Sequence, residues 1–187
     1  MSHDFNPDFV KIRRGKKIVS DEAWIKSFLE QAPAGVLATI HEDQPFLSTK
    51  LFVYDENRHA IYMHSADEGR VWQNVHTNPK ACFTTYEMGR LIPAPRACKF
   101  GVKYKSVVVF GTIHVVDDVE ETIAVLQLFM DKYAPHLKLG EAYPPISKDE
   151  LGGLAVYRME ILGWSAKEDK ENPDTPGAYR YEDLTRG

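Results

Sequence analysis

Cysteine is scarce in this sequence, and long apolar runs are missing. Cys82 and Cys98 are the only two cysteines among 187 residues, too few for a disulfide framework and not spaced as a CxxC unit. No apolar stretch approaches the roughly 20 residues that cross a bilayer. A secretion signal begins with basic residues that are followed by an apolar run. The first ten residues are mainly polar and do not resemble such a signal. We therefore expect a cytoplasmic protein with no membrane partner.

Positive charge is not in excess either. The chain has 23 basic and 27 acidic residues, and its formal net charge is −4. No overall positive field is present to hold a phosphate backbone, so nucleic acid is not an expected partner. The one basic run, residues 11–17, favours a solvated N-terminal arm. An interaction module that binds an anionic partner through this arm stays open as an alternative.

Familiar catalytic and metal-binding signatures are absent as well. None of the seven histidines has a partner at the spacing of a zinc site, and neither cysteine lies beside a histidine. No GxSxG or GxGxxG motif occurs. Two cations flank Cys98 and could activate its thiol, but a small buried cysteine is the more common finding. The sequence therefore predicts no metal site and no serine or cysteine nucleophile.

What is present is enough apolar sequence for one folded domain. Hydrophobic residues make up 43% of the chain and aromatic residues 11%, which suffices for a sizeable core. Short apolar runs separated by turn residues predict six or seven strands, many of them joined as hairpins. The predicted strands are residues 36–40, 46–54, 60–64, 81–86, 103–116 and 155–162. Gly111 lies within one of them and indicates a bulge or a close approach by another group.

Three segments predict helices. Residues 20–32 start with an N-cap serine, and residues 70–76 form a short helix that ends before Pro79. The clearest helix begins at Asp118, with Glu121 in the N3 position. Its expected apolar stripe consists of Val119, Ile123, Leu126, Met130 and Tyr133. Residues 88–101 contain two prolines and two glycines and predict a loop. We expect a mainly β protein with peripheral helices, closed as a barrel over residues 1–167 with an N-terminal arm, and a polar tail at 168–187.

A small polar loop at residues 64–70 is the best candidate for a binding site. It combines free backbone N–H groups, a helix N-terminus and the Arg70 guanidinium, which together suit a phosphate. Asp67 and Glu68 would oppose an anion unless they point to solvent, and a plain strand-to-helix connection is the simpler alternative. Trp72, Tyr104 and Trp164 lie near candidate ligand-facing segments and could flank a planar cofactor, although core packing also explains each of them.

Several short motifs occur in a characteristic order between residues 13 and 167. They are GVLAT at 35–39, FVYD at 52–55, IYMHSA at 61–66, GR at 69–70, NP at 78–79 with CF at 82–83, AC at 97–98, YKSV at 104–107 and FG at 110–111. In this order they resemble the FMN-binding split β-barrels of the pyridoxamine 5′-phosphate oxidase-like class, particularly the nitroimidazole-resistance-type branch.

This resemblance implies a homodimer with FMN bound at the subunit interface. The phosphate would be held by Gly69, Arg70 and the loop before them, and His64 would face the substrate as the catalytic residue. A backbone N–H or the Ser65 hydroxyl would lie near flavin N5 or O4 and tune the flavin potential. The edges of the isoalloxazine would meet two strands, and two residues would come from the opposite subunit. The strand residues are Ser48, Thr49, Lys50 and Leu51, then Met63, His64 and Ser65; the opposite subunit would supply Ser106 and Trp164.

The sequence also departs from true pyridoxamine phosphate oxidases. Leu47 and Phe52 occupy strand positions where those enzymes have an arginine and a lysine, Val71 follows Arg70, and no Arg-x-His motif follows Trp164. The resemblance therefore implies a different FMN-dependent oxidoreductase, which takes electrons from a reduced nicotinamide donor and reduces a small electron-poor acceptor such as a nitroaromatic or quinone. A barrel that carries or senses flavin or haem without turnover is the alternative.

Overall fold

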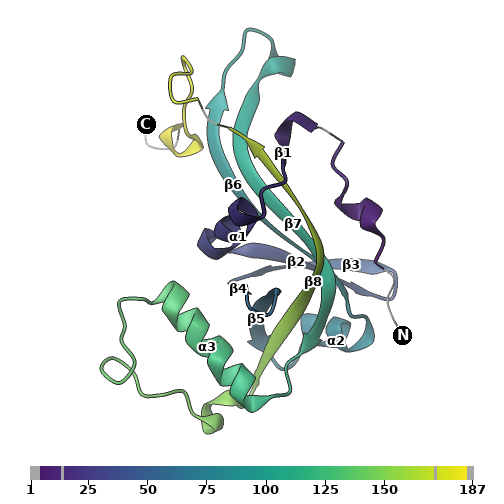
Figure 1. The fold of residues 1–187 in the computed structure, drawn as a ribbon, viewed down its shortest axis with the longest axis vertical. Coiled ribbons are helices and arrows are strands. Elements are labelled where there is room, and N and C mark those ends of the chain that lie inside the picture. The colour runs from purple at the N-terminus through teal and green to yellow at the C-terminus, as the bar shows by residue number, and fades with distance from the viewer. Residues whose placement is uncertain (1–4, 14, 171, 185–187) are drawn as a thin grey trace.

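The fold is built around one antiparallel sheet, seen in a computed structural model that describes residues 5–13, 15–170 and 172–184 (Figure 1). Within these ranges the strands are β1 (Ile18–Val19), β2 (Gly35–His41), β3 (Gln44–Lys50), β4 (Val53–Asp55), β5 (Ala60–Ala66), β6 (Lys80–Ile92), β7 (Gly101–Val115) and β8 (Leu154–Asp169). The α-helices are α1 (Glu22–Gln31), α2 (Arg70–Thr77) and α3 (Val119–Tyr133). Short 3₁₀ helices lie at Pro7–Val10, Gly15–Lys17, Ala97–Lys99, Lys148–Leu151 and Tyr181–Leu184. The predicted mainly β split barrel with peripheral helices is confirmed.

Neighbouring strands follow the order β3-β2-β6-β7-β8-β5-β4, and β1 pairs with β8. The two end strands of this order, β3 and β4, are separated in the chain by only Leu51 and Phe52. One predicted strand over 46–54 is therefore wrong, because the chain turns at these two residues from one end of the sheet to the other. The Tyr133 hydroxyl lies 3.0 Å from Phe52 N and 2.8 Å from Phe52 O, so α3 satisfies the peptide groups at this corner.

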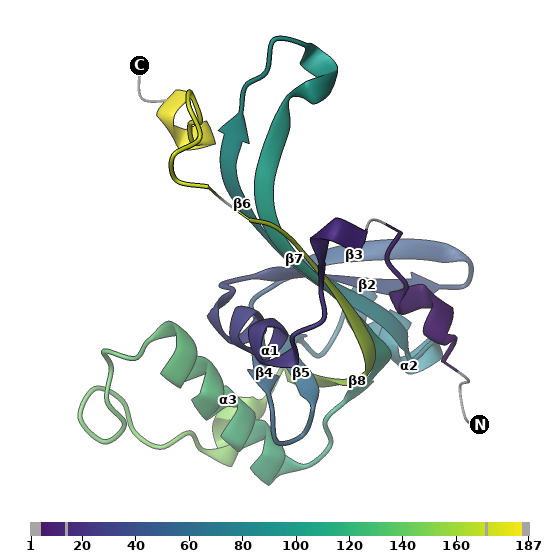
Figure 2. The ribbon, with the colours of Figure 1, turned by 45° about the horizontal axis from the view of Figure 1, so that its top comes forward.

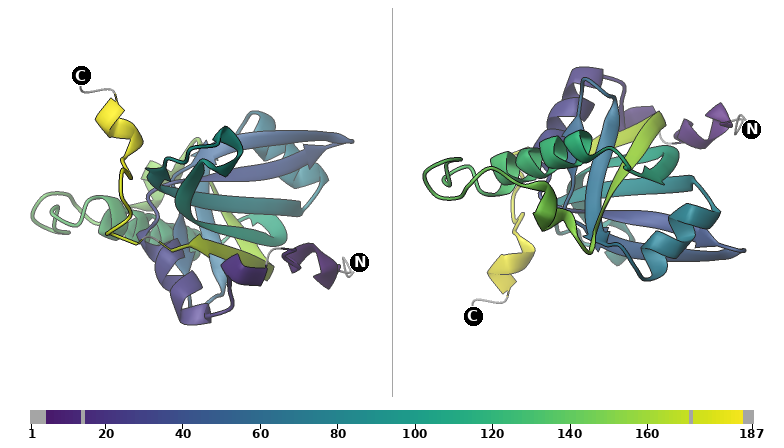
Figure 3. Two further views of the ribbon diagram at one scale, coloured as in Figure 1. Left: turned by 90° about the horizontal axis from the view of Figure 1, so that it is seen from above. Right: turned by 90° about the horizontal axis from the view of Figure 1, so that it is seen from below.

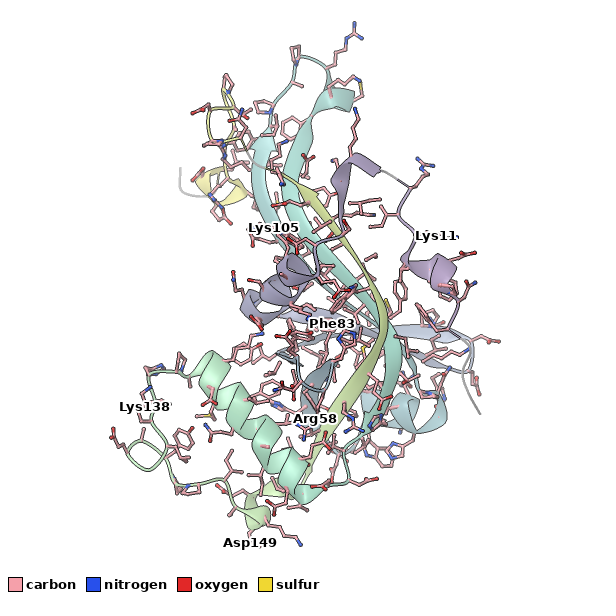
Figure 4. All side chains as sticks on the ribbon, viewed as in Figure 1. Lys11, Arg58, Phe83, Lys105, Lys138 and Asp149 are labelled. Atoms are coloured by element: carbon pink, nitrogen blue, oxygen red, sulfur yellow. The ribbon has the colours of Figure 1, made fainter. Side chains whose placement is uncertain are left out.

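The apolar residues form two clusters, one inside the barrel and one beneath α3. Leu37, Phe83 and Val109 are fully buried in the first cluster, and Figure 4 shows Phe83 at the centre of the molecule. Val125 and Phe129 of α3 belong to the second cluster, with residues of β4, β5 and β8. Figure 3 shows α3 lying across these strands when the molecule is seen from below. The sheet around β5 therefore has a barrel side and an α3 side.

β6 and β7 form a long hairpin that extends well beyond the barrel (Figure 2). The predicted loop at 88–101 is too long, because pairing continues to Ile92 and Gly101 after an irregularity between Met88 and Leu91, and only residues 93–100 lie outside the strands. An isolated two-stranded ribbon is only marginally stable in water. Here Tyr179 of the C-terminal segment forms a β-bridge with Leu91, which supports the ribbon along one edge.

β8 is longer than the sequence indicates. It does not end at Leu162 but continues to Asp169, two residues past the expected domain boundary at 167. Its pairing with β7 shifts register between Phe110 and Gly111, which confirms the expected irregularity at Gly111. A Cβ at Gly111 would lie 1.9 Å from the Glu160 carbonyl oxygen. Only glycine fits at this position, because the neighbouring strand approaches so closely.

Helix ends follow the sequence rules with one change. Asp118 caps α3 as predicted, since its side chain accepts a hydrogen bond of 2.9 Å from Glu121 N. Asp21, and not Ser20, caps α1. None of the helices in the described ranges combines the length and apolar composition needed to cross a membrane.

Candidate functional site

The candidate site begins with the alternation of side chains along β5. Met63 is fully buried in the barrel cluster, and Ser65 points to the same side. His64 points to the α3 side, where its ring meets the edge of Phe129 at a centroid distance of 4.7 Å. The Nδ1 atom of His64 is buried and has no hydrogen-bond partner among the residues that the structure describes. A buried polar atom without a partner is uncommon in folded proteins.

Lys50, at the end of β3, lies close enough to act on His64. Burial lowers the pKa of His64, and the Lys50 ammonium lowers this pKa further. Burial also lowers the pKa of Lys50. No carboxylate in the described ranges forms an ion pair with Lys50. The pair therefore presents a neutral imidazole beside a cation that lacks a counter-charge.

The loop after β5 ends in an open helix N-terminus. Gly69 precedes α2 with φ of 88°, a conformation that favours glycine, and no side chain caps the helix. Arg70 is exposed and forms no ion pair within the described chain. Asp67 and Glu68 are also exposed to solvent. The arrangement predicted for a phosphate, with free N–H groups, a guanidinium and solvated acids, is present.

β3, which ends at Lys50 beside His64, offers an open strand edge. It stands at the end of the sheet order, so its outer peptide groups have no strand partner in the described residues. Ser48 and Lys50 are partly exposed, whereas Thr49 and Leu51 are exposed, Leu51 to 51%. Free peptide N–H and C=O groups along an edge can pair with the polar rim of a planar ring system.

Two predicted site residues lie elsewhere in the chain. Trp164 is eight residues further along β8 than Val156, the partner of His64, a distance of about 26 Å along an extended strand. The Trp164 ring contacts His59 at 4.8 Å within its own chain. Ser106 lies on the outer face of the long hairpin, paired with Tyr86. The structure does not bring either residue to the His64 site of the same chain, and their contact with a flavin of a second copy stays a prediction.

Lys132 is a residue that the sequence did not single out. Its ammonium donates a 3.0 Å hydrogen bond to Phe52 O and lies 4.1 Å from the centroid of the Phe52 ring. Burial lowers the pKa of Lys132 to about 8. Its place in the last turn of a helix is ordinary for a basic residue, so no sequence signal marks it. Phe52 lies 80 positions away in the chain.

The remaining candidates are mostly paired or exposed. Lys17 of the N-terminal arm forms an ion pair with Asp169, and Lys11 forms one with Asp8. Cys98 is exposed, so the expectation of a buried cysteine is wrong. No group of three or more histidine, cysteine or acidic side chains that could hold a metal ion occurs in the described part of the chain.

Comparisons with known proteins give one family and several similar folds. A family model described as pyridoxamine 5′-phosphate oxidase matches residues 21–168, whereas no curated protein matches the chain significantly. The flavocytochrome Anf3 from Azotobacter vinelandii superposes with a TM-score of 0.77 at 21% identity, over 96% of this chain and 80% of that one.

Two further solved structures have the same fold. The FAD and haem binding protein from Mycobacterium smegmatis superposes with a TM-score of 0.73 at 18% identity, over 91% of this chain and 80% of that one. A putative 5-nitroimidazole antibiotic resistance protein from Bacteroides thetaiotaomicron superposes with a TM-score of 0.65 at 21% identity, over 80% of this chain and 85% of that one. At these identities the likeness establishes the fold alone.

Proposed function

Because the chain belongs to the pyridoxamine 5′-phosphate oxidase family, we propose that it is an FMN-dependent oxidoreductase. It takes electrons from a reduced nicotinamide donor and passes them to a small electron-poor acceptor such as a nitroaromatic or quinone. The observation that carries this proposal is the start of α2, which no side chain caps and where the exposed Arg70 has no ion pair among the described residues. Free backbone N–H groups and a guanidinium at one helix start suit the phosphate group of FMN.

The residues around His64 fit a flavin by their chemistry. Gly69 and Arg70 hold the phosphate at the open end of α2, and the free edge of β3 meets the polar rim of the ring. Lys50 supplies a positive charge that no carboxylate of the described chain neutralises. His64 is neutral near pH 7 because its pKa is lowered, so it can donate or accept one hydrogen bond on the substrate side. The flavin, when bound, supplies the electron-transfer chemistry.

The substrate is not pyridoxamine phosphate in this proposal. Leu47 and Phe52 stand where the oxidases proper have a basic pair, and neither can contact a phosphate through charge. Leu47 is 66% exposed on β3, whereas Phe52 is fully buried in the barrel cluster. An uncharged acceptor with low electron density fits the remaining groups better than a phosphorylated amine.

We further propose that two copies of the chain form a homodimer through the outer face of the sheet. Cross-strand pairing places Leu47, Tyr86 and Met88 on this one face. Leu47, Tyr86 and Met88 are exposed to 66%, 54% and 41%. Apolar surface of this kind marks an interaction site, and a two-fold axis lets the same patch cover itself. Ser106 lies on this face too, in a position to approach a site on the second copy.

A flavin or haem carrier without turnover is the second candidate. A neutral imidazole with an unpartnered nitrogen also suits haem iron. Two solved structures with this fold are named as a flavocytochrome and as an FAD and haem binding protein. Among the residues that the structure describes, no acid and base pair dedicated to a substrate is evident at the site.

Steady-state oxidation of NADH and NADPH by the FMN-loaded protein separates the two candidates. We expect nicotinamide oxidation that depends on an added nitroaromatic or quinone and that falls at least about tenfold in His64→Ala, a loss typical of removing a positioned hydrogen-bonding group. Bound flavin with no nicotinamide oxidation, whatever the acceptor, would favour the carrier and contradict the oxidoreductase.

A further inference from the structure

Ser65 and Tyr157 share a hydrogen bond within the candidate site. The Tyr157 hydroxyl lies 3.0 Å from Ser65 Oγ, and Ser65 Oγ lies 3.0 Å from the Ala66 carbonyl oxygen. Tyr157 is fully buried on β8, whereas Ser65 is partly exposed at the end of β5. The two residues are 92 positions apart in the chain, so only the pairing of β5 with β8 brings them together.

The number of hydroxyl protons fixes the direction of these bonds. Each hydroxyl has one proton, and the Ala66 carbonyl can only accept. Burial raises the pKa of Tyr157, so its phenol keeps its proton at neutral pH. Within the described chain, Ser65 is the hydrogen-bond partner recorded for this phenol, and a buried phenol without an acceptor costs free energy. Tyr157 therefore donates to Ser65, and Ser65 donates to Ala66.

We propose that Tyr157 is a positioning residue that makes Ser65 a hydrogen-bond acceptor towards the bound flavin. This inference rests on the proposed function and on the expectation, from the family resemblance, that Ser65 lies near flavin N5 or O4. With its own proton directed to Ala66, Ser65 Oγ offers a lone pair, so it meets an N–H or O–H group rather than a carbonyl or phosphate oxygen. Of the two flavin atoms expected near Ser65, O4 is always an acceptor, whereas N5 carries a proton only in the reduced flavin. Ser65 therefore stabilises the reduced form and raises the flavin potential.

The Tyr62 hydroxyl provides a matched control on the same strand. Tyr62 is also fully buried, and its hydroxyl donates a 2.5 Å hydrogen bond to Glu121 on the α3 side of the sheet. Removing either phenol hydroxyl deletes one buried hydrogen bond. Only the Tyr157 hydroxyl reaches Ser65, so only its loss should change the flavin potential.

The test is the two-electron midpoint potential of FMN bound to the wild type and to Ser65→Ala, Tyr157→Phe, Tyr62→Phe and the double variant of Ser65 and Tyr157. Ser65→Ala should weaken binding of reduced FMN about tenfold relative to oxidised FMN, which lowers the potential by about 30 mV. Tyr157→Phe should also lower the potential, by about 15 mV, which corresponds to about a threefold weaker binding of reduced FMN relative to oxidised FMN. In the double variant, Tyr157→Phe should not lower the potential further than Ser65→Ala does alone. Tyr62→Phe should leave the potential unchanged.

The outcomes separate this inference from the proposed function. If FMN binds but Ser65→Ala leaves the potential unchanged or raises it, the acceptor role of Ser65 is wrong. If Tyr157→Phe lowers only the free energy of unfolding, as Tyr62→Phe should, Tyr157 is structural and its positioning role is wrong. Ser65 is partly exposed, so Ser65→Ala tests the inference even if Tyr157→Phe does not fold. If the wild type binds neither FMN nor FAD, the proposed function fails, and this inference fails with it.

Discussion

Tyr62 and His64 lie two residues apart on the same strand and face the same helix, yet their surroundings differ. The Tyr62 hydroxyl donates to Glu121, and Arg158 donates to both oxygens of that carboxylate at 2.9 and 3.1 Å. The Nδ1 atom of His64 has no partner in the described chain, and its charged neighbour Lys50 has no counter-charge there. The first group links α3 to the sheet, whereas in our proposal the second group is completed by a ligand. Arg158 Nε in the first group is also buried without a partner in the described chain, so the contrast between the two groups lies in the shared carboxylate, which Tyr62 has and His64 lacks.

The largest effect is expected where the paired cluster is broken. Glu121→Ala leaves the Tyr62 hydroxyl and the Arg158 guanidinium without their shared acceptor, so the free energy of unfolding should fall by about 3 kcal/mol. Guanidinium denaturation measures this change. Glu120→Ala removes an exposed carboxylate from the same helical turn and should cost less than about 1 kcal/mol. Equal losses in the two variants would mean that the cluster does not hold α3.

Arg70→Ala should have the next largest effect, and on binding rather than on stability. Loss of a charge-assisted hydrogen bond to a phosphate should weaken FMN binding about 30-fold, as measured by fluorescence titration. The free energy of unfolding should not change, because Arg70 is exposed. Lys138→Ala is the control, since Lys138 lies on the loop after α3 (Figure 4). If both variants bind FMN like the wild type, Arg70 is not the phosphate anchor.

His64→Leu should weaken FMN binding about tenfold, equivalent to about 1.4 kcal/mol. Unlike Glu121→Ala, it should leave the free energy of unfolding of the flavin-free protein unchanged or raise it, because it removes a buried nitrogen that has no partner in the described chain. Parallel titration and denaturation measure both quantities. A loss of stability similar to that of Glu121→Ala would show that His64 is structural and would remove the contrast with Tyr62.

The smallest expected effect concerns Lys132 and pH. Burial lowers its pKa from 10.5 to about 8, so between these values the unfolded chain binds more protons than the folded one. The free energy of unfolding should therefore rise with pH across this window, by about 1 kcal/mol after allowance for partial exposure. Lys132→Met should show a smaller rise between pH 8 and pH 10 in denaturation experiments. An equal rise in both proteins would assign the pH dependence to other groups.

Local patterns in the sequence predicted which segments form helices and strands better than they predicted where these helices and strands begin and end. The Asp118 cap depends on residues within a few positions of one another, and it is confirmed. The apolar stripe expected on α3 is only partly right, because the helix buries Thr122, Val125 and Phe129, whereas Leu126 and Tyr133 are partly buried against the same cluster. The turn at Leu51 and Phe52 is different, because it depends on α3, about 80 residues later in the chain. The long hairpin likewise depends on pairing that continues past Gly89 to Ile92 and Gly101, which local turn signals cannot reveal.

The residues of the candidate site also differ in how well local sequence patterns predict them. Residues adjacent in the chain, such as His64, Gly69 and Arg70, could be selected from the strand, loop and helix signals around them. Contacts across the sheet could not, because no local signal marks Tyr157 as the partner of Ser65 or Lys50 as the neighbour of His64. Those contacts follow from strand order and register, which the motif order suggested only through family resemblance.

The visible absorption spectrum of the freshly purified protein, recorded again after addition of FMN and dialysis, tests the central claim most directly. Our account predicts a flavin band that survives dialysis in the wild type and is weakened in Arg70→Ala and His64→Leu. A haem band in place of the flavin would contradict the FMN assignment and favour the haem-binding alternative. A colourless protein that retains neither FMN nor FAD would contradict the account as a whole, because the unpaired groups around His64 would then not form a flavin site.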